Sequence, residues 1–185
     1  MKRLPPTALG AGAGLLGAVA LLLMGVMTRS MLRVPSVPEV LVEWGTFYVP
    51  GELFTWMVNR FGAQAKLALF WGMVGGILLV GLLLGALYAR RPTPRLAVLI
   101  TLAAWLFIML VVLPADGLGF FGTDLYPAGP FAATAAYLLG CFAYGIVLSL
   151  VYWVGARRGL LAPAAAGTPH AASGSATTAA KEVSR

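Results

Sequence analysis

Four long stretches of the sequence contain no charged side chain, and this feature constrains the fold more than any other. They run over 8–28, 67–89, 96–115 and 125–156. A membrane hydrocarbon core of about 30 Å requires about 20 apolar residues in a helix that rises about 1.5 Å per residue. Each stretch is long enough. We therefore predict an all-α integral membrane protein, a four-helix transmembrane bundle with spans at about 8–28, 67–89, 96–115 and 131–156.

The composition of the chain agrees with a membrane location. Of the 185 residues, 60% are hydrophobic and only 10% are charged, whereas soluble proteins carry about a quarter charged residues. The net charge of +7 does not indicate nucleic-acid binding, because the basic residues flank the apolar stretches instead of lining one face. The predicted partner is the lipid bilayer, and no nucleic acid is expected.

The distribution of charge around the four stretches predicts an orientation. Basic residues flank the cytoplasmic ends of membrane spans, and a cytoplasmic N-terminus places most of them on that side. The acidic residues then lie mainly outside, and an even number of crossings returns the C-terminus to the cytoplasm. The basic residues placed inside are Lys2, Arg3, Arg90, Arg91, Arg95, Arg157, Arg158, Lys181 and Arg185; those outside are Arg29, Arg33, Arg60 and Lys66.

Glycines four residues apart recur in the first two stretches. Lipid tails are as apolar as leucine, so transmembrane helices associate through close packing, and G-x-x-x-G pairs let two backbones approach. We predict that these glycines pack the spans of the bundle, and they also offer a surface for self-association. They are Gly10, Gly14, Gly72, Gly76, Gly81 and Gly85.

The segment 34–64, between the first two spans, is too long for a tight hairpin. Ser36 and Glu39 have the spacing of a capping box, which predicts a helix from about 37 to 47. Pro50 and Gly51 interrupt it, and a second helix is expected from about 52 to 61. Short apolar helices that carry tryptophan and flanking charges suit a membrane surface. We predict an outer interfacial segment with two short helices.

The remaining connections and the tail differ in composition. The proline- and arginine-rich turn at 90–95 predicts a helical hairpin of the second and third spans. In 114–130, three glycines around Phe120 and Phe121 predict a turn that folds the two rings back onto the bundle or the interface. The membrane domain covers 1–161. Residues 162–185 are rich in Ala, Gly, Ser and Thr, which predicts a disordered cytoplasmic tail.

The spans lack the side chains that usually carry membrane chemistry. The single histidine, His170, lies in the tail, and no carboxylate, lysine or arginine lies within a span. Haem ligation, metal binding and ion-coupled transport usually require such groups. Cys141 is expected to be a small buried apolar residue. We predict no cofactor, no metal site and no catalytic residue.

Acidic and aromatic residues gather instead in the outer segments. Solvation and salt bridges to Arg60 or Lys66 would account for the acids alone. Glu39 and Glu43 are four residues apart and share one side of a helix. The candidate residues for docking a partner are Glu39, Glu43, Trp44, Glu52, Trp56, Arg60, Phe120, Phe121 and Asp124.

The order of these features resembles a known family. Segments 38–43, 61–66 and 117–122 are similar to parts of the membrane-spanning N-terminal region of bacterial molybdopterin-dependent oxidoreductases of the sulfite-oxidase type. The resemblance covers about residues 8–156. It implies a bacterial cytoplasmic membrane and a redox protein as partner. Those relatives continue into a pterin-binding domain, whereas this chain has its low-complexity tail there, so no residue is assigned to molybdenum.

Three functions follow as hypotheses. The first is a non-catalytic membrane anchor or subunit that docks a separately encoded redox protein on its outer face. The second is a binding or transport protein for a lipid, quinone or other uncharged molecule. It would need a cavity between spans, lined by Trp71, Trp105, Phe107 and Tyr144. The third is a membrane enzyme, which would require the acids at 39, 43, 116 and 124 to converge on one pocket.

Overall fold

The computed structural model describes residues 5–48 and 50–158, and about 85% of them are helical. These ranges contain no β-strand. Four helices are long and apolar enough to cross a membrane: Pro6–Leu32, Leu67–Tyr88, Pro94–Ala115 and Gly129–Arg157. The all-α architecture predicted from the sequence is confirmed. The predicted tail, 162–185, lies outside the described residues.

The first half of the chain forms four α-helices. Helix α1 (Pro6–Leu32) begins with a proline in its first turn, and ends where Arg33 adopts a left-handed conformation and its N–H donates to the Arg29 carbonyl. Helices α2 (Val37–Tyr48) and α3 (Gly51–Phe61) lie within one residue of the predicted bounds. A short 3₁₀ turn, η1 (Gly62–Gln64), leads into α4 (Ala65–Tyr88).

The third long helix changes its winding near its end. It consists of α5 (Pro94–Phe107), a π-helical segment η2 (Ile108–Val112) and α6 (Leu113–Ala115). In the π segment the Leu113 N–H donates to the Ile108 carbonyl, five residues earlier. Pro114 follows directly, and a proline ring clashes with the carbonyl four residues before it. The wider winding relieves that clash. The 3₁₀ turn η3 (Phe120–Gly122) and helix α7 (Gly129–Arg157) complete the chain.

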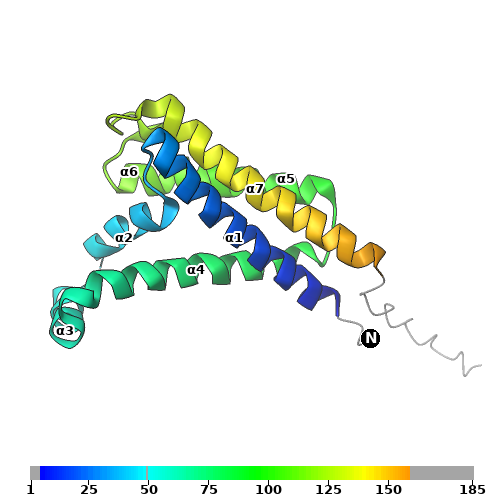
Figure 1. Ribbon diagram of the computed structural model, residues 1–185, viewed down its shortest axis with the longest axis horizontal. Coiled ribbons are helices and arrows are strands. Elements are labelled where there is room, and N and C mark those ends of the chain that lie inside the picture. Colours follow the sequence, from blue (N-terminus) through cyan, green and yellow to red (C-terminus); the bar gives the residue numbers. More distant parts are fainter. Residues whose placement is uncertain (1–4, 49, 159–185) are drawn as a thin grey trace, which may run out of the picture.

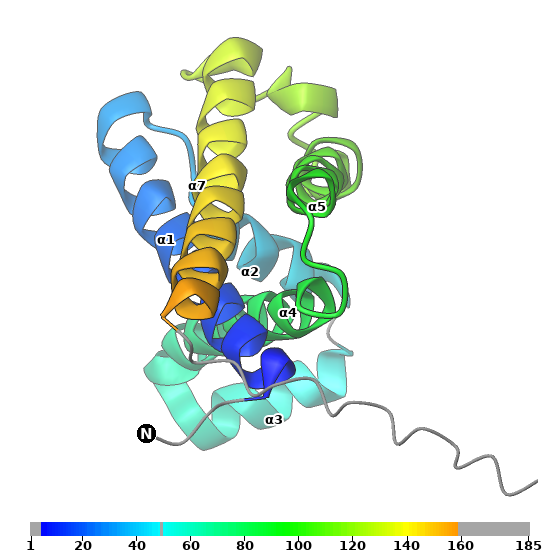
Figure 2. The ribbon, with the colours of Figure 1, turned by 90° about the vertical axis from the view of Figure 1, so that its right-hand side faces the viewer.

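The helices form a wedge (Figure 1). Helices α1 and α7 lie side by side, and α5 packs against α7 away from α1 (Figure 2). Helix α4 contacts α1 near the C-terminal end of α4, and the N-terminal half of α4 runs away from α1 toward α3. Helix α2 lies in the opening between α4 and the rest. We call the end that carries α2, α3, α6 and η3 the acidic end, because Glu39, Glu43, Glu52, Asp116 and Asp124 lie there.

Glycines make the contact between α1 and α4. Gly10 and Gly14 of α1 face Gly81 and Gly85 of α4. A Cβ atom added at Gly14 would overlap the Gly81 carbonyl and lie 2.7 Å from the Gly85 Cα. The backbones therefore touch directly, and the prediction that these glycines pack the spans is confirmed for four of the six.

Helix α7 joins this contact through a tyrosine. The Tyr144 ring lies over Gly17, where an added Cβ would come 2.9 Å from the ring. Its hydroxyl donates to the Gly81 carbonyl at 3.2 Å. Tyr144 therefore links all three helices. Cys141, one turn before it, is 1% exposed, as expected for a small apolar core residue.

The other two glycines lie elsewhere on α4. An added Cβ at Gly72 or Gly76 would meet no atom within 4 Å. Of the most apolar 18-residue stretch of α4, only 6% is buried inside the molecule. The other four glycines already pack α1 against α4. Self-association through glycines therefore stays a prediction for Gly72 and Gly76 only.

Candidate functional site

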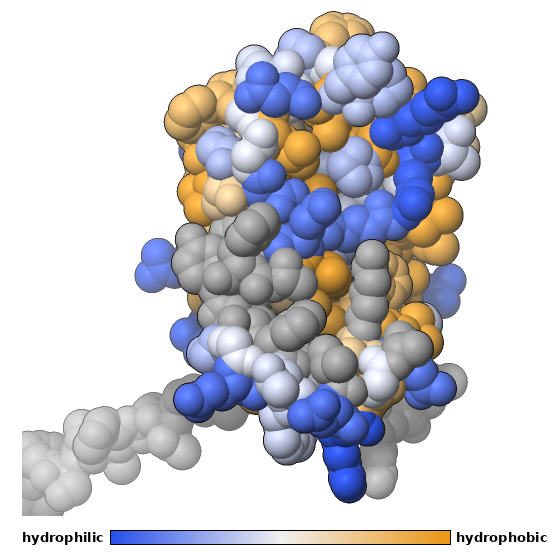
Figure 3. Space-filling view, turned by 90° about the vertical axis from the view of Figure 1, so that its left-hand side faces the viewer, coloured by the Kyte–Doolittle hydropathy of each residue, from blue (hydrophilic) through white to orange (hydrophobic). Residues whose placement is uncertain are grey.

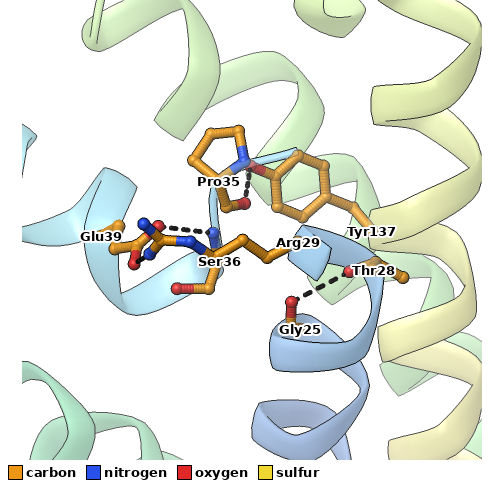
Figure 4. A network of polar contacts seen from close by, with 7 residues as sticks. All are labelled: Gly25, Thr28, Arg29, Pro35, Ser36, Glu39 and Tyr137. Carbon is orange, nitrogen blue, oxygen red and sulfur yellow. Dashed lines mark hydrogen bonds and ion pairs between the residues drawn. The ribbon is translucent and has the colours of Figure 1, made fainter. Parts of the chain in front are cut away.

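The junction between α1 and α2 is held by a network of polar contacts (Figure 4). Arg29 of α1 forms an ion pair with Glu39 of α2. The same carboxylate accepts a hydrogen bond from the Ser36 N–H at 3.1 Å, which confirms this half of the predicted capping box. Glu39 was predicted as a docking residue, and the alternative interpretation gave it a salt bridge to Arg60 or Lys66. The partner is Arg29, and Glu39 fixes the start of α2.

Helix α7 is tied to the same junction. The Tyr137 hydroxyl donates to the Pro35 carbonyl at 2.9 Å, and the Thr28 hydroxyl donates back to the Gly25 carbonyl of its own helix. Pro35 lies in the connection between α1 and α2. The connection between α1 and α2 is therefore fixed by the ion pair between these two helices and by the hydrogen bond from α7.

One turn along α2, Glu43 lies near Asp116, which follows α6. Both oxygens of the Asp116 carboxyl group are buried, and they have no hydrogen-bond partner within the described ranges. Burial raises the pKa of Asp116 above its ordinary value of 3.8, and the charge of Glu43 raises that pKa further. Two neighbouring carboxylates disfavour a second negative charge. Of the four acids required by the enzyme hypothesis, Glu43 thus lies near enough to Asp116 to affect its charge.

The glycine-rich turn after α6 brings one aromatic ring against α5. Gly117, Gly119 and Gly122 have φ angles of 74°, 72° and 75°, a conformation that glycine adopts readily. The centroid of the Phe121 ring lies 6.0 Å from that of Trp105 in α5. The predicted folding back is confirmed for Phe121, whereas Phe120 is 61% exposed. The Asp124 carboxylate lies beside Gly119.

Two exposed aromatic residues near this turn were absent from the predicted docking set. Tyr126 is 94% exposed and Phe131 is 86% exposed. Both belong to the segment between Asp116 and the first turn of α7. The sequence signal for Tyr126 was its position beside Pro127, outside the predicted spans; Phe131 follows Pro130 and begins the predicted fourth span.

The docking residues on α3 form a separate group. Glu52 and Arg60 are exposed. Trp56 is 58% exposed and meets the Phe61 ring edge to face at 6.2 Å. The Trp44 side chain lies outside the described part of the structure. Helix α3 lies beside the start of α4, away from α6 and η3 (Figure 1), and hydrophilic residues gather in an upper and a lower group on this end (Figure 3). The docking residues on α3 therefore lie apart from Phe120, Phe121 and Asp124.

The residues predicted to line a cavity between spans are dispersed. Trp71 is 62% exposed and Phe107 is 56% exposed. Trp105 packs on Phe121, and Tyr144 lies in the glycine-packed core. None of these four side chains lines the groove that the structure has between α5 and α7.

No protein-family model, curated protein or solved structure matches this chain. The resemblance to the membrane region of molybdopterin-dependent oxidoreductases therefore stays a prediction.

Proposed function

We propose that this chain is a non-catalytic membrane anchor that docks a separately encoded redox protein on its acidic end. In this proposal the four long helices cross a bacterial cytoplasmic membrane, with both termini in the cytoplasm. Helices α2 and α3 lie in the outer headgroup region. The acidic end is then the outer face, and the partner is extracytoplasmic.

The separation of charge along the molecule supports this orientation. Arg90, Arg91 and Arg95 lie in or beside the α4–α5 turn, and Arg157 and Arg158 end α7. The five acidic residues of the described ranges lie at the opposite end. Arginine-rich ends of membrane helices face the cytoplasm.

The exposed aromatic residues around the glycine-rich turn carry the docking proposal. Phe120, Tyr126 and Phe131 are between 61% and 94% exposed, and the exposed Asp124 lies between Phe120 and Tyr126 along the chain. Aromatic side chains dominate the binding energy of protein interfaces. Exposed aromatic rings beside an exposed carboxylate suit neither water alone nor hydrocarbon alone. The surface suits a partner with an apolar patch and a basic rim.

Co-purification of the tagged full-length chain in mild detergent tests the proposal. The variant F120A/Y126A/F131A should lose most of a co-purifying redox protein, because interface aromatics contribute about 2 kcal/mol or more each when they are central. The matched control is F107A, which removes a ring that is 56% exposed on α5 and should retain the partner.

Two results would contradict the proposal. One is a chain that purifies alone from its native membrane in several detergents. The other is a partner that is retained equally by the triple variant and by F107A.

A further inference from the structure

A long apolar groove lies between α5 and α7, at the end opposite the acidic residues. Its volume is about 780 Å³, within the range of about 300 to 1,000 Å³ that ligand sites occupy. Mainly apolar side chains line it, among them Val98 of α5 and Ile146 and Trp153 of α7. Val98, Ile146 and Trp153 are each at least half exposed, so the groove opens sideways, toward the surface that lipid would cover.

The groove runs along α7 from Phe142 to Ala156. Within it, Gly145 lies against Thr101, whose hydroxyl would overlap a Cβ added at that glycine. The end of the groove beside the α4–α5 turn is lined by Pro92, Pro94 and Ala156. From Phe142 to Ala156 the helix rises by about 21 Å at about 1.5 Å per residue. This length is enough to cover one half of a hydrocarbon core of about 30 Å.

Arginines adjoin the residues that line the groove beside the α4–α5 turn. Arg91 and Arg95 are next in sequence to the two lining prolines, and Arg157 follows Ala156; all three are exposed. The Arg157 guanidinium lies 3.6 Å above the ring centre of Trp153, a residue that lines the groove. This cation–π contact holds one positive charge beside the groove. No acidic residue occurs from 53 to 115 or from 125 to 158, so nothing nearby in sequence neutralises these charges.

We infer that the groove binds an anionic phospholipid, with one acyl chain between α5 and α7 and the phosphate headgroup among the arginines at 91, 95 and 157. The groove supplies an apolar slot as long as one leaflet, and guanidinium groups bind phosphate oxygens in pairs. Basic pockets between transmembrane helices favour anionic headgroups. An uncharged quinone offers the arginines no phosphate, and the phosphate of a zwitterionic lipid is offset by the cationic group of the same headgroup, so an anionic lipid neutralises the arginines best. This inference does not depend on the docking proposal.

Native mass spectrometry of the full-length protein in detergent tests the headgroup. Phosphatidylglycerol and phosphatidylcholine with identical acyl chains are added separately. Phosphatidylglycerol should remain bound and phosphatidylcholine should not. The variant R91Q/R95Q should weaken phosphatidylglycerol binding by about fivefold for each arginine removed. The control R33Q/R60Q removes two exposed arginines from the other half of the molecule and should bind as the unchanged protein does.

A second pair of variants tests the groove itself. Ile146 lines the groove and is 61% exposed, whereas Leu139, on the same helix, is 50% exposed outside it. I146W should fill the slot and abolish retention of phosphatidylglycerol, and L139W should not. Equal retention of both lipids, or loss of binding in R33Q/R60Q equal to that in R91Q/R95Q, would overturn the inference. If I146W fails to fold, the arginine variants decide the matter alone.

Discussion

At the scale of single residues, the core depends on glycines that admit a neighbouring backbone. The distinction is sharp between Gly14, which faces α4, and Gly12, which has open space around it. The sequence predicted close packing from G-x-x-x-G spacing, and that was correct for the pairs at 10/14 and 81/85. It could not predict which pair would be used within the chain, because the pair at 72/76 has the same spacing.

Leucine at position 14 should destabilise the protein. Overfilled packing usually costs about 1 to 3 kcal/mol, and here the added side chain would overlap backbone atoms that cannot move aside. Thermal unfolding in detergent measures the effect. The same change at Gly12 is the control, with an expected shift within about 0.5 kcal/mol; equal shifts at the two positions would contradict the α1–α4 contact.

Removing the Tyr144 hydroxyl should lower the free energy of unfolding by less than leucine at position 14 does. The variant Y144F keeps the ring over Gly17 but loses the hydrogen bond to the Gly81 carbonyl. Hydrogen bonds between transmembrane helices contribute about 0.6 kcal/mol on average, so a small decrease in unfolding free energy is expected. Y126F, at a residue that is 94% exposed, should show none.

Asp116 should make stability depend on pH. Its pKa is raised in the folded state, so the ionised carboxylate is less favourable there than in the unfolded chain, and the folded state gains stability as the pH falls through the folded pKa toward 3.8. D116N should remove that gain, and E43Q should reduce it. Unfolding scans across the acid range measure it, with D124N as the exposed control; an unchanged pH slope in D116N would contradict the assignment.

At the scale of helices, local sequence signals predicted the short elements better than the long ones. The capping box at Ser36 and the break at Pro50 gave the bounds of α2 and α3 to within one residue. The π segment was not predicted, although Pro114 marks its position. Helices α4 and α7 are apolar all round, so no periodicity indicates which side packs inward. For that reason the groove and the wedge could not be predicted.

At the α1–α2 connection, the contributions of Arg29 and Glu39 to stability should depend on one another. A double-mutant cycle with R29Q and E39Q should give a coupling energy of about 0.2 to 1 kcal/mol, the usual range for ion pairs near the surface. The measurement is unfolding free energy at low ionic strength, and added salt should reduce the coupling. Additive effects of the two changes would show that the pair does not stabilise this connection.

At the scale of the whole molecule, the segregation of charge predicts a membrane orientation that can be measured. A cysteine introduced at Thr123 should react with a membrane-impermeant maleimide added to intact cells. One introduced at Arg158 should react only after the membrane is opened. The native Cys141 is 1% exposed and should contribute little background. The reverse labelling pattern would invert the proposed topology.

The pairing of α1 with α7 has a consequence for assembly. These two helices are the first and the last of the long helices, and Tyr144 and Tyr137 of α7 complete contacts with Gly17 and Pro35. Contacts between distant parts of a chain form late, since the intervening segment must be in place first. In the proposed membrane arrangement, the flank of α1 that α7 covers therefore faces lipid during synthesis until α7 is inserted, and a chain that ends before residue 137 keeps that flank against lipid.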